Sequence, residues 1–490
     1  MSIDMYPHIP GYRTTLRDGN LKFAPPAPAT QSVLIIGLAA DGPGNDPRRP
    51  LTLAQAELLY GVPTQDLSLV LAWQEAIDAG CEDVRLLRLP GVVAQVSLDS
   101  KLLAKGLYSG TKYNGTEVVV GSKTISIGDD LEYDLEKLSE DATPTEVSKT
   151  LDELIKEVNE DPENTLVRLE LEGITEGSAD ATTVATGTYT LTGGTDQPAN
   201  LKTALDNVYE LLVDYQVDMV VPICVFADDG ENNYALDLAT LCSKMSLHNR
   251  LTIGFISTSM LEDTSLTGIA TYYASINALV NTYEATIEGK FVDVGRFIGV
   301  CVGDVQFRDR TSADLGFYMA PAAVGTAALT STLPGQSAIT NKTIPGVRGI
   351  GYQFSMIQLN ELSGKGFITY RPRTGRGVVV VDGPTASIRT SDYNRISTVR
   401  IVGDITAALV AVSEPFIGEG MNVVQRNALH TAVKNVLDNA QEQGSIQQYI
   451  FTLQSTPMEA VQGIINILLE VVPAFELRKI RTVITLRPEL

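Results

Sequence analysis

The 490-residue chain is poor in the side chains that build metal centres, disulfide scaffolds and catalytic triads. It has 4 cysteines, 3 histidines and 1 tryptophan. The cysteines form no CxxC pair and have no histidine cluster nearby, which excludes zinc-type spacing and a disulfide framework. We expect four buried free thiols in a reducing cytoplasm, at Cys81, Cys224, Cys242 and Cys301.

Long apolar runs are also missing. No window reaches the roughly 18 uninterrupted apolar residues that a membrane helix needs. Residues 1–19 lack the apolar centre of a secretory signal. We therefore expect a protein that is neither exported by the usual route nor inserted directly into a membrane.

Positive charge is scarce, with 37 Lys+Arg against 59 Asp+Glu and a net charge of −22. Between Asp129 and Asp180 there are 18 acidic and 4 basic residues, so this block carries −14 and the rest of the chain −8. Nucleic-acid affinity depends on neutralising phosphates, so no nucleic-acid partner is expected. The acidic block is typical of a solvated outer face.

Catalytic and cofactor motifs are absent as well. Residues 121–124 (GSKT) end like a phosphate loop, but Ser122 replaces the required glycine. Asp228 and Asp229 follow a predicted strand, where a solvated loop is the better interpretation. The sequence therefore predicts no catalytic, cofactor-binding or metal-binding residue and no cofactor. An α/β enzyme with a β-rich insertion stays open as an alternative on fold alone.

The pattern that is present predicts an α/β (α+β) multidomain protein. A buried strand at 33–37, helices at 52–61 and 69–80 and a strand at 84–89 open a central α/β domain, which we assign to residues 25–95 and 201–390. Residues 96–200 alternate Thr, Gly and Val and predict a β-rich acidic inserted outer domain. Further helices are expected near 266–281 and 313–330.

The two chain ends have a different character. Residues 1–24 lack periodicity and precede a Pro-rich spacer, which predicts an extended N-terminal arm. Residues 391–478 form a compact α/β C-terminal domain, with a helix after Gly403, a long helix over 422–443, and strands at 448–453 and 464–472. Residues 479–490 alternate apolar and polar side chains, the pattern of an edge strand that serves as a C-terminal arm.

Several separated segments resemble the contractile phage tail sheath family, whose relatives include pyocin and type VI secretion sheaths. Residues 35–47 (IIGLAADGPGNDP) look like a family segment near the N-terminus, followed by the helix 52–61 and by 79–89 (AGCEDVRLLRL). In the C-terminal domain, the similar segments are 397–400 (STVR), 414–419 (EPFIGE), the helix with Arg426, 444–446 (GSI), 449–451 (YIF) and 473–477 (PAFEL). Residues 96–200 match weakly.

The resemblance implies a structural subunit, not an enzyme, that polymerises around a tail tube and contracts to drive the tube through the host envelope. It also implies that terminal arms of neighbouring copies exchange strands, and an open helical array follows from such heterologous contacts. On this basis the arm strands are expected at Tyr12, Thr14, Leu16, Ile480, Thr482, Ile484 and Leu486.

A polar stripe on the long C-terminal helix suggests a second contact. Asn422, Arg426, His430 and Lys434 recur every four residues and would share one helix face. In an acidic chain this partly basic stripe is a candidate tube-facing surface, and an ordinary solvated helix face is the alternative.

The expected partners are further copies of the chain in a helical stack of hexameric rings, the tail tube protein, and baseplate and tail terminator proteins. The expected location is the tail sheath of a virion, assembled in the host cytoplasm. A sheath from a pyocin, type VI secretion or related contractile injection system is the alternative function.

Overall fold

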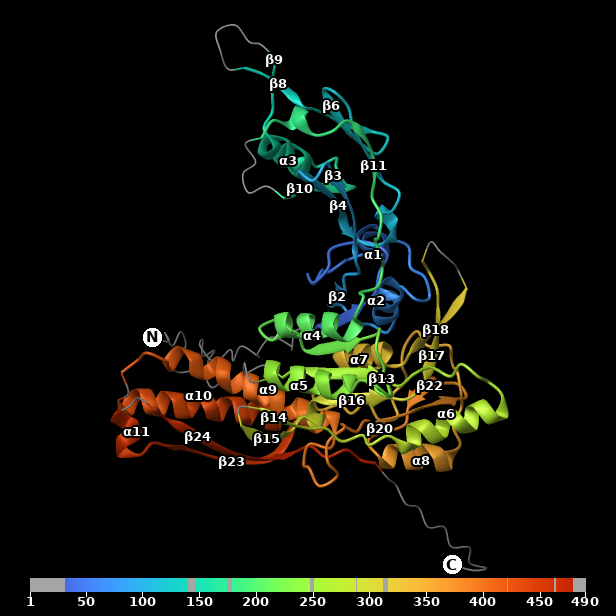
Figure 1. The fold of residues 1–490 in the computed structure, drawn as a ribbon. Coiled ribbons are helices and arrows are strands. Elements are labelled where there is room, and N and C mark those ends of the chain that lie inside the picture. The colour runs from blue at the N-terminus through green and yellow to red at the C-terminus, as the bar shows by residue number, and fades with distance from the viewer. Residues whose placement is uncertain are drawn as a thin grey trace, which may run out of the picture.

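A computed structural model gives the fold of residues 31–139, 146–173, 179–246, 251–287, 289–311, 316–420, 422–461 and 464–478. Figure 1 shows a central body, a β-rich insertion that projects from one end of it, and a C-terminal unit that extends from its side. The mixture of helices and sheets agrees with the predicted α/β class.

The body is built on a six-stranded sheet in the order β2-β1-β12-β13-β16-β20. All five strand pairs are parallel. The order reverses between β1 and β12, as in doubly wound folds. The strands are β1 (Val33–Gly37), β2 (Val84–Arg88), β12 (Met219–Pro222), β13 (Ile253–Ser257), β16 (Ile298–Cys301) and β20 (Phe367–Ile368).

Helices cover both faces of this sheet, because alternate strand residues point to opposite faces and both sets are apolar. Val33 and Ile35 belong to one buried cluster, which α2 and α7 complete. Leu34 and Ile36 belong to the other, which α4, α5 and α8 complete. The helices are α1 (Leu53–Tyr60), α2 (Leu69–Asp78), α4 (Leu201–Leu212), α5 (Tyr234–Ser246), α6 (Leu266–Ala278), α7 (Ala323–Thr332) and α8 (Met356–Gly364).

Small antiparallel sheets surround the body. They comprise β14 (Glu284–Ile287) with β15 (Lys290–Asp293), β17 (Asp304–Arg308) with β18 (Phe317–Pro321) and β19 (Gly349–Ile350), and β21 (Tyr370–Arg373) with β22 (Gly377–Val380). The helix predicted over 313–330 is wrong in its first half, where the strand β18 pairs with β17, and α7 begins at Ala323.

The insertion has its own apolar core, made by strands and one amphipathic helix. The helix α3 (Leu151–Glu160) has a capping box at Thr150 and Glu153, which fixes its start. The strands are β3 (Val93–Leu98), β4 (Leu102–Ser109), β5 (Glu117–Val120), β6 (Thr124–Ile127), β7 (Leu131–Asp134), β8 (Glu136–Leu138), β9 (Glu146–Ser148), β10 (Val167–Leu171) and β11 (Gly187–Thr190).

A buried arginine joins the insertion to the body. Arg88, at the end of β2, is 0 % exposed, and its guanidinium donates to the carbonyls of Ala39, Gly42 and Ser109 at 2.7–2.9 Å. Ser109 lies at the end of β4 in the insertion, whereas Ala39 and Gly42 belong to the loop after β1. One side chain therefore satisfies three buried acceptors from both parts, which fixes the base of the insertion.

We expect Arg88→Met to lower the free energy of unfolding by about 3 kcal/mol, because three buried carbonyls lose a charged donor. Urea unfolding would measure the loss, and limited proteolysis would report loosening at the base of the insertion. The control is Lys105→Met, which removes an exposed ion pair with Glu170 and should cost less than about 1 kcal/mol. Equal losses in the two variants would contradict this role of Arg88.

Candidate assembly interface

The C-terminal unit consists of two helices packed on a two-stranded sheet. Its elements are α9 (Ile396–Ser413), α10 (Val423–Glu442), the short α11 (Pro457–Val461), β23 (Ile446–Gln454) and β24 (Asn466–Pro473). Six buried side chains make its core: Ile401, Ile405, Leu429, Val433, Leu437 and Ile446. Among the described residues, no layer covers the other side of this two-stranded sheet.

Local signals set the limits of α10. The Asn422 side chain accepts a hydrogen bond from the Gln425 amide at 2.9 Å and caps the first turn. At the other end Gly444 adopts φ +77°, a left-handed conformation that glycine takes without steric cost. The chain then turns directly into β23, so the helix and the strand lie close together and run in opposite directions.

The sheet is open at both edges within the described residues, because β23 and β24 pair only with each other there. Alternate residues of an antiparallel strand direct their N–H and C=O groups away from the partner strand. Arg426 donates to the Leu453 carbonyl at 2.8 Å, which places Leu453 in this outward set, with Phe451 and Tyr449. The free edge of β23 therefore offers backbone groups to another strand.

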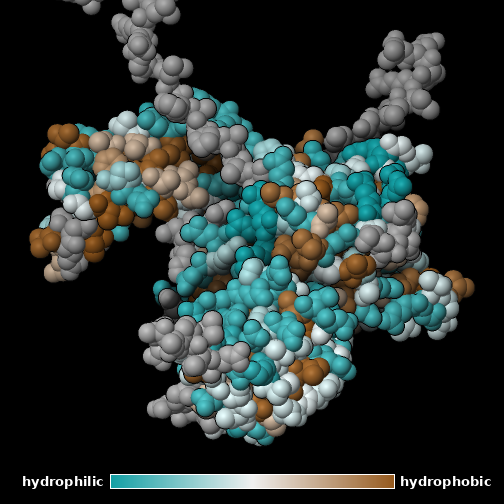
Figure 2. All heavy atoms as spheres, turned by 90° about the horizontal axis from the view of Figure 1, so that it is seen from above, coloured by the Kyte–Doolittle hydropathy of each residue, from teal (hydrophilic) through white to brown (hydrophobic). Residues whose placement is uncertain are grey.

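One sheet face is also exposed. Tyr449, Phe451 and Leu469 pack toward the helices, whereas Ile450 and Leu468 on the other face are 68 % and 52 % exposed. Figure 2 views the C-terminal unit, at the left, from the side of α9 and α10, where hydrophobic residues also gather. An apolar face beside unpaired strand edges is the structural feature that marks a protein interface.

The stripe predicted on α10 runs along β23. Asn422 caps the helix, Arg426 bonds Leu453, and the His430 ring lies 4.8 Å from the Phe451 ring. Lys434 is exposed one turn further along. The contacts of Arg426 and His430 with β23 could not be foreseen from spacing on the helix alone.

Two anchors fix the points where the described chain begins and ends. Gln31 accepts a hydrogen bond from Arg400 of α9 at 3.0 Å, and Arg400 also donates to the Leu333 carbonyl at 2.5 Å. At the other end, Arg478 donates to Asp382 at 2.6 Å. The predicted arm residues Tyr12, Thr14, Leu16, Ile480, Thr482, Ile484 and Leu486 lie outside the described residues.

Helix α9 connects the C-terminal unit to the body. Ile396 and Val399 belong to the body core, and Ile401 and Ile405 to the core of the C-terminal unit. Residues 396–416 are long and apolar enough to span a membrane by length and composition, but a core helix passes the same test. Burial lowers the pKa of Arg400 to about 10, so its guanidinium stays charged at neutral pH.

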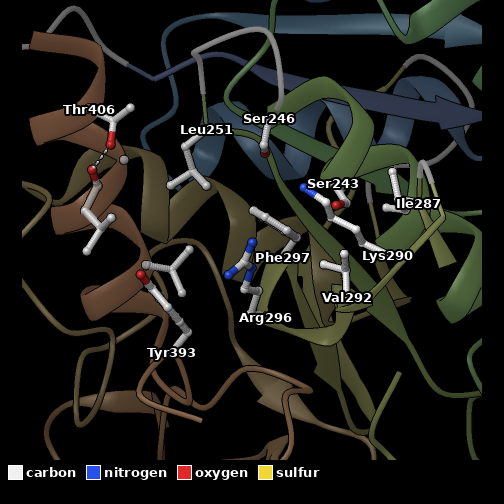
Figure 3. Close-up of a pocket in the computed structure, with 13 residues that line it drawn as sticks. Ser243, Ser246, Leu251, Ile287, Lys290, Val292, Arg296, Phe297, Tyr393 and Thr406 are labelled. Atoms are coloured by element: carbon white, nitrogen blue, oxygen red, sulfur yellow. Dashed lines mark hydrogen bonds between the residues drawn. The ribbon is translucent and has the colours of Figure 1, made fainter. Parts of the chain in front are cut away.

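A cavity of about 340 Å³ separates part of α9 from the body. Figure 3 shows α9 on one side of it and Ser243, Lys290 and Val292 on the other. The Arg296 guanidinium lies over the rings of Phe297 and Tyr393, at 4.7 and 5.1 Å from their centroids. The packing of α9 on the body is therefore incomplete along this flank.

In doubly wound enzymes, ligands bind where the strand order of the sheet reverses. A cavity of about 690 Å³ lies at the reversal between β1 and β12. The described residues that line it include no lysine, arginine or histidine, so it is a poor receptor for an anionic cofactor. Burial raises the pKa of Glu75 there well above its usual value.

The weak motifs of the sequence have structural roles. Residues 121–124 form the turn between β5 and β6, where the Gly121 amide donates to the Thr124 carbonyl at 2.8 Å, and no helix follows. Asp228 accepts from the Ser259 amide, and Asp229 from the amides of Glu231 and Asn232. In the described part of the chain, no three His, Cys, Asp or Glu side chains gather as a metal site.

The sequence matches no protein-family model and no curated protein. Solved structures do match along nearly the whole chain. The sheath tail protein of Desulfitobacterium hafniense has 12 % identity and a TM-score of 0.55, with 94 % of this chain and 100 % of that chain covered. The sheath tail protein of Listeria innocua has 14 % identity and a TM-score of 0.54, with 91 % and 96 % covered.

A third match is the contracted sheath of an extracellular contractile injection system, with 11 % identity and a TM-score of 0.55, covering 100 % of this chain and 99 % of that one. The chain has the fold of a contractile sheath subunit. Each of these structures is a structural sheath protein and not an enzyme. At these identities the likeness establishes the fold, and the predicted resemblance is confirmed at that level.

We expect Arg400→Met to lower the free energy of unfolding by about 3 kcal/mol, because the partly buried Leu333 carbonyl and Gln31 lose a shared donor that is itself buried. The matched control is Arg426→Met, which removes a single exposed bond to Leu453 and should cost about 1 kcal/mol or less. Chemical denaturation of both variants measures the difference. A smaller loss in Arg400→Met than in the control would refute the anchoring role.

Proposed function

We propose that this chain is the structural subunit of a contractile phage tail sheath. It polymerises in a helical stack of hexameric rings around a tail tube, and contracts to drive that tube through the host envelope. The observation that carries the proposal is the two-stranded sheet of β23 and β24, with open edges and an exposed apolar face, in a chain with the sheath fold.

Strand exchange supplies the connection between copies in this proposal. The arms at residues 1–24 and 479–490 of neighbouring copies add strands to β23 and β24, so backbone hydrogen bonds replace unpaired edges. Each bond contributes about 1 kcal/mol net. A few strands per copy, repeated along the array, keep the copies connected while their bodies change packing.

The same proposal implies where the sheath assembles and which proteins it contacts. The sheath would assemble in the host cytoplasm and become part of the virion tail, with the tube protein, baseplate and tail terminator as partners. The acidic insertion would form its outer surface. A second candidate is the sheath of a non-phage contractile injection system, which is favoured by the match to an extracellular contractile injection system and to the anti-feeding prophage sheath.

The first test is polymerisation of the purified full-length chain. We expect long hollow tubes by negative-stain microscopy, whereas an enzyme would give small closed oligomers. A synthetic peptide of residues 479–490 should slow tube growth, because it occupies the acceptor edge. The same peptide with Thr482→Pro and Ile484→Pro is the control, since proline removes the donors a strand needs.

Two results would contradict the proposal. One is a chain that stays in small closed oligomers under all conditions of assembly. The other is tube growth that the two peptides inhibit equally.

The tube contact is proposed for the stripe of Asn422, Arg426, His430 and Lys434, because it is basic in an acidic chain. Lys434→Glu tests this tube contact without disturbing β23. Lys434 is exposed, and no hydrogen bond joins it to β23 in the part of the chain that the structure describes. We expect self-assembly to remain normal and co-assembly with purified tube to fall at least tenfold by co-sedimentation. The exposed neighbour Asn435 provides the control as Asn435→Glu. Normal co-assembly of Lys434→Glu would exclude the stripe as the tube contact.

A further inference from the structure

The start of the described chain lies in an open groove beside α9. Gln31 lines this groove with Asp218 and Met219 on the body side. Arg400, Ala407 and Ala411 line it on the α9 side. The groove has a volume of about 640 Å³ and continues to Glu414 at the end of the helix.

The wall formed by α9 places Ala407, Val410 and Ala411 between the charged residues Asp404 and Glu414. The helix is apolar enough along its length to pass a membrane-span test, yet only a third of the window is buried within the subunit. Its groove residues Ala407 and Ala411 are small and exposed, so the backbone of another segment can approach α9 closely there. Apolar surface of this kind is normally covered in a soluble assembly.

Arg400, which lines the same groove, has one buried donor without a partner among the described residues. Arg400 is 2 % exposed, and its terminal nitrogens bond Gln31, Leu333 and Pro334. Its Nε atom has no hydrogen-bond partner among the described residues. Buried donors rarely remain unpaired, so an acceptor from outside the described residues would complete the hydrogen bonding of this side chain.

The groove leads in one direction from Gln31. On the side of the cavity in Figure 3, Leu251 packs on Gly403, where a Cβ atom would lie 2.4 Å from Leu251. This contact leaves no room for a chain to cross between the groove and that cavity. The groove itself continues along α9 to Glu414, so a segment that follows it from Gln31 runs toward that end.

The sequence before Gln31 fits this path in length and chemistry. Residues 24–30 (APPAPAT) are uncharged and rich in proline and alanine. In a polyproline II conformation they span about 22 Å, and α9 from Arg400 to Glu414 spans about 21 Å. Lys22 would then lie beyond the far end, near the carboxylate of Glu414.

We propose that residues 24–30 dock in the groove along α9 of their own copy, from Arg400 to Glu414. This docking goes beyond the proposed sheath function, and it requires only a single subunit. It delivers the N-terminal arm to the C-terminal unit, beside the sheet of β23 and β24. A pull on the arm would then act on α9 along its length.

The test is cross-linking in the full-length chain at a concentration where mass photometry shows monomers. Ala24→Cys with Glu414→Cys should be joined by a short bis-maleimide within one copy. The control pair is Ala24→Cys with Leu211→Cys, an exposed position on α4 close in sequence to the groove residue Gln216. We expect at least fivefold faster cross-linking in the Glu414 pair, mapped by mass spectrometry.

Two further variants test whether the cross-link depends on the groove. Ala407→Phe fills the groove and should reduce the Glu414 cross-link at least fivefold, whereas Thr406→Phe fills the neighbouring cavity and should not. Equal rates for the two cysteine pairs would overturn the proposal. So would covalent dimers, in place of internal links, when the single-cysteine chains are mixed. Polymerisation is not needed for any of these readouts, so failure of the sheath proposal would be seen separately.

Discussion

The structure depends on one helix that belongs to two cores. The first turn of α9 is buried in the body through Ile396 and Val399, and the next turns carry Ile401 and Ile405 into the C-terminal unit. No flexible linker separates the two parts, because the helix is continuous between them. A displacement of the C-terminal unit must therefore move α9, and with it Arg400 and the start of β1.

This constraint gives a role to the anchors at Gln31 and Arg478, where the described part of the chain begins and ends. Gln31 is held by Arg400, and Arg478 by Asp382, which also binds Arg395 one residue before α9. Glu476 accepts from Ser397 in the first turn of α9 at 2.6 Å. Tension on either arm would reach the same helix, because every one of these anchors contacts α9 or its immediate start.

The sequence was a good guide where the signals are local. The helix predicted over 422–443 is α10, because Asn422 and Gly444 act within one turn. It was a poor guide where distant contacts decide. The sequence predicts a helix that begins after Gly403, but Gly403 lies inside α9, where Leu251 packs against its Cα. Phe317–Pro321 is a strand and not a helix, because β17 pairs with it. The Arg400–Gln31 bond joins residues 369 positions apart, so no local pattern could predict it.

The two-stranded sheet of β23 and β24 has an exposed face and open edges within the described residues. A two-stranded sheet is marginal alone and is stabilised here by α9 and α10 on one face. The other face and both edges would remain a liability in a free subunit. Arg426 already occupies the Leu453 carbonyl on the β23 edge, which reduces its capacity to pair nonspecifically. An incoming strand has to replace the exposed Arg426–Leu453 bond with a ladder of several backbone hydrogen bonds. The exchange therefore lowers the free energy only for a segment long enough to form that ladder. In the proposed exchange, the arms of adjacent copies would supply such segments at high local concentration, whereas the edge of a lone subunit would keep its bond to Arg426.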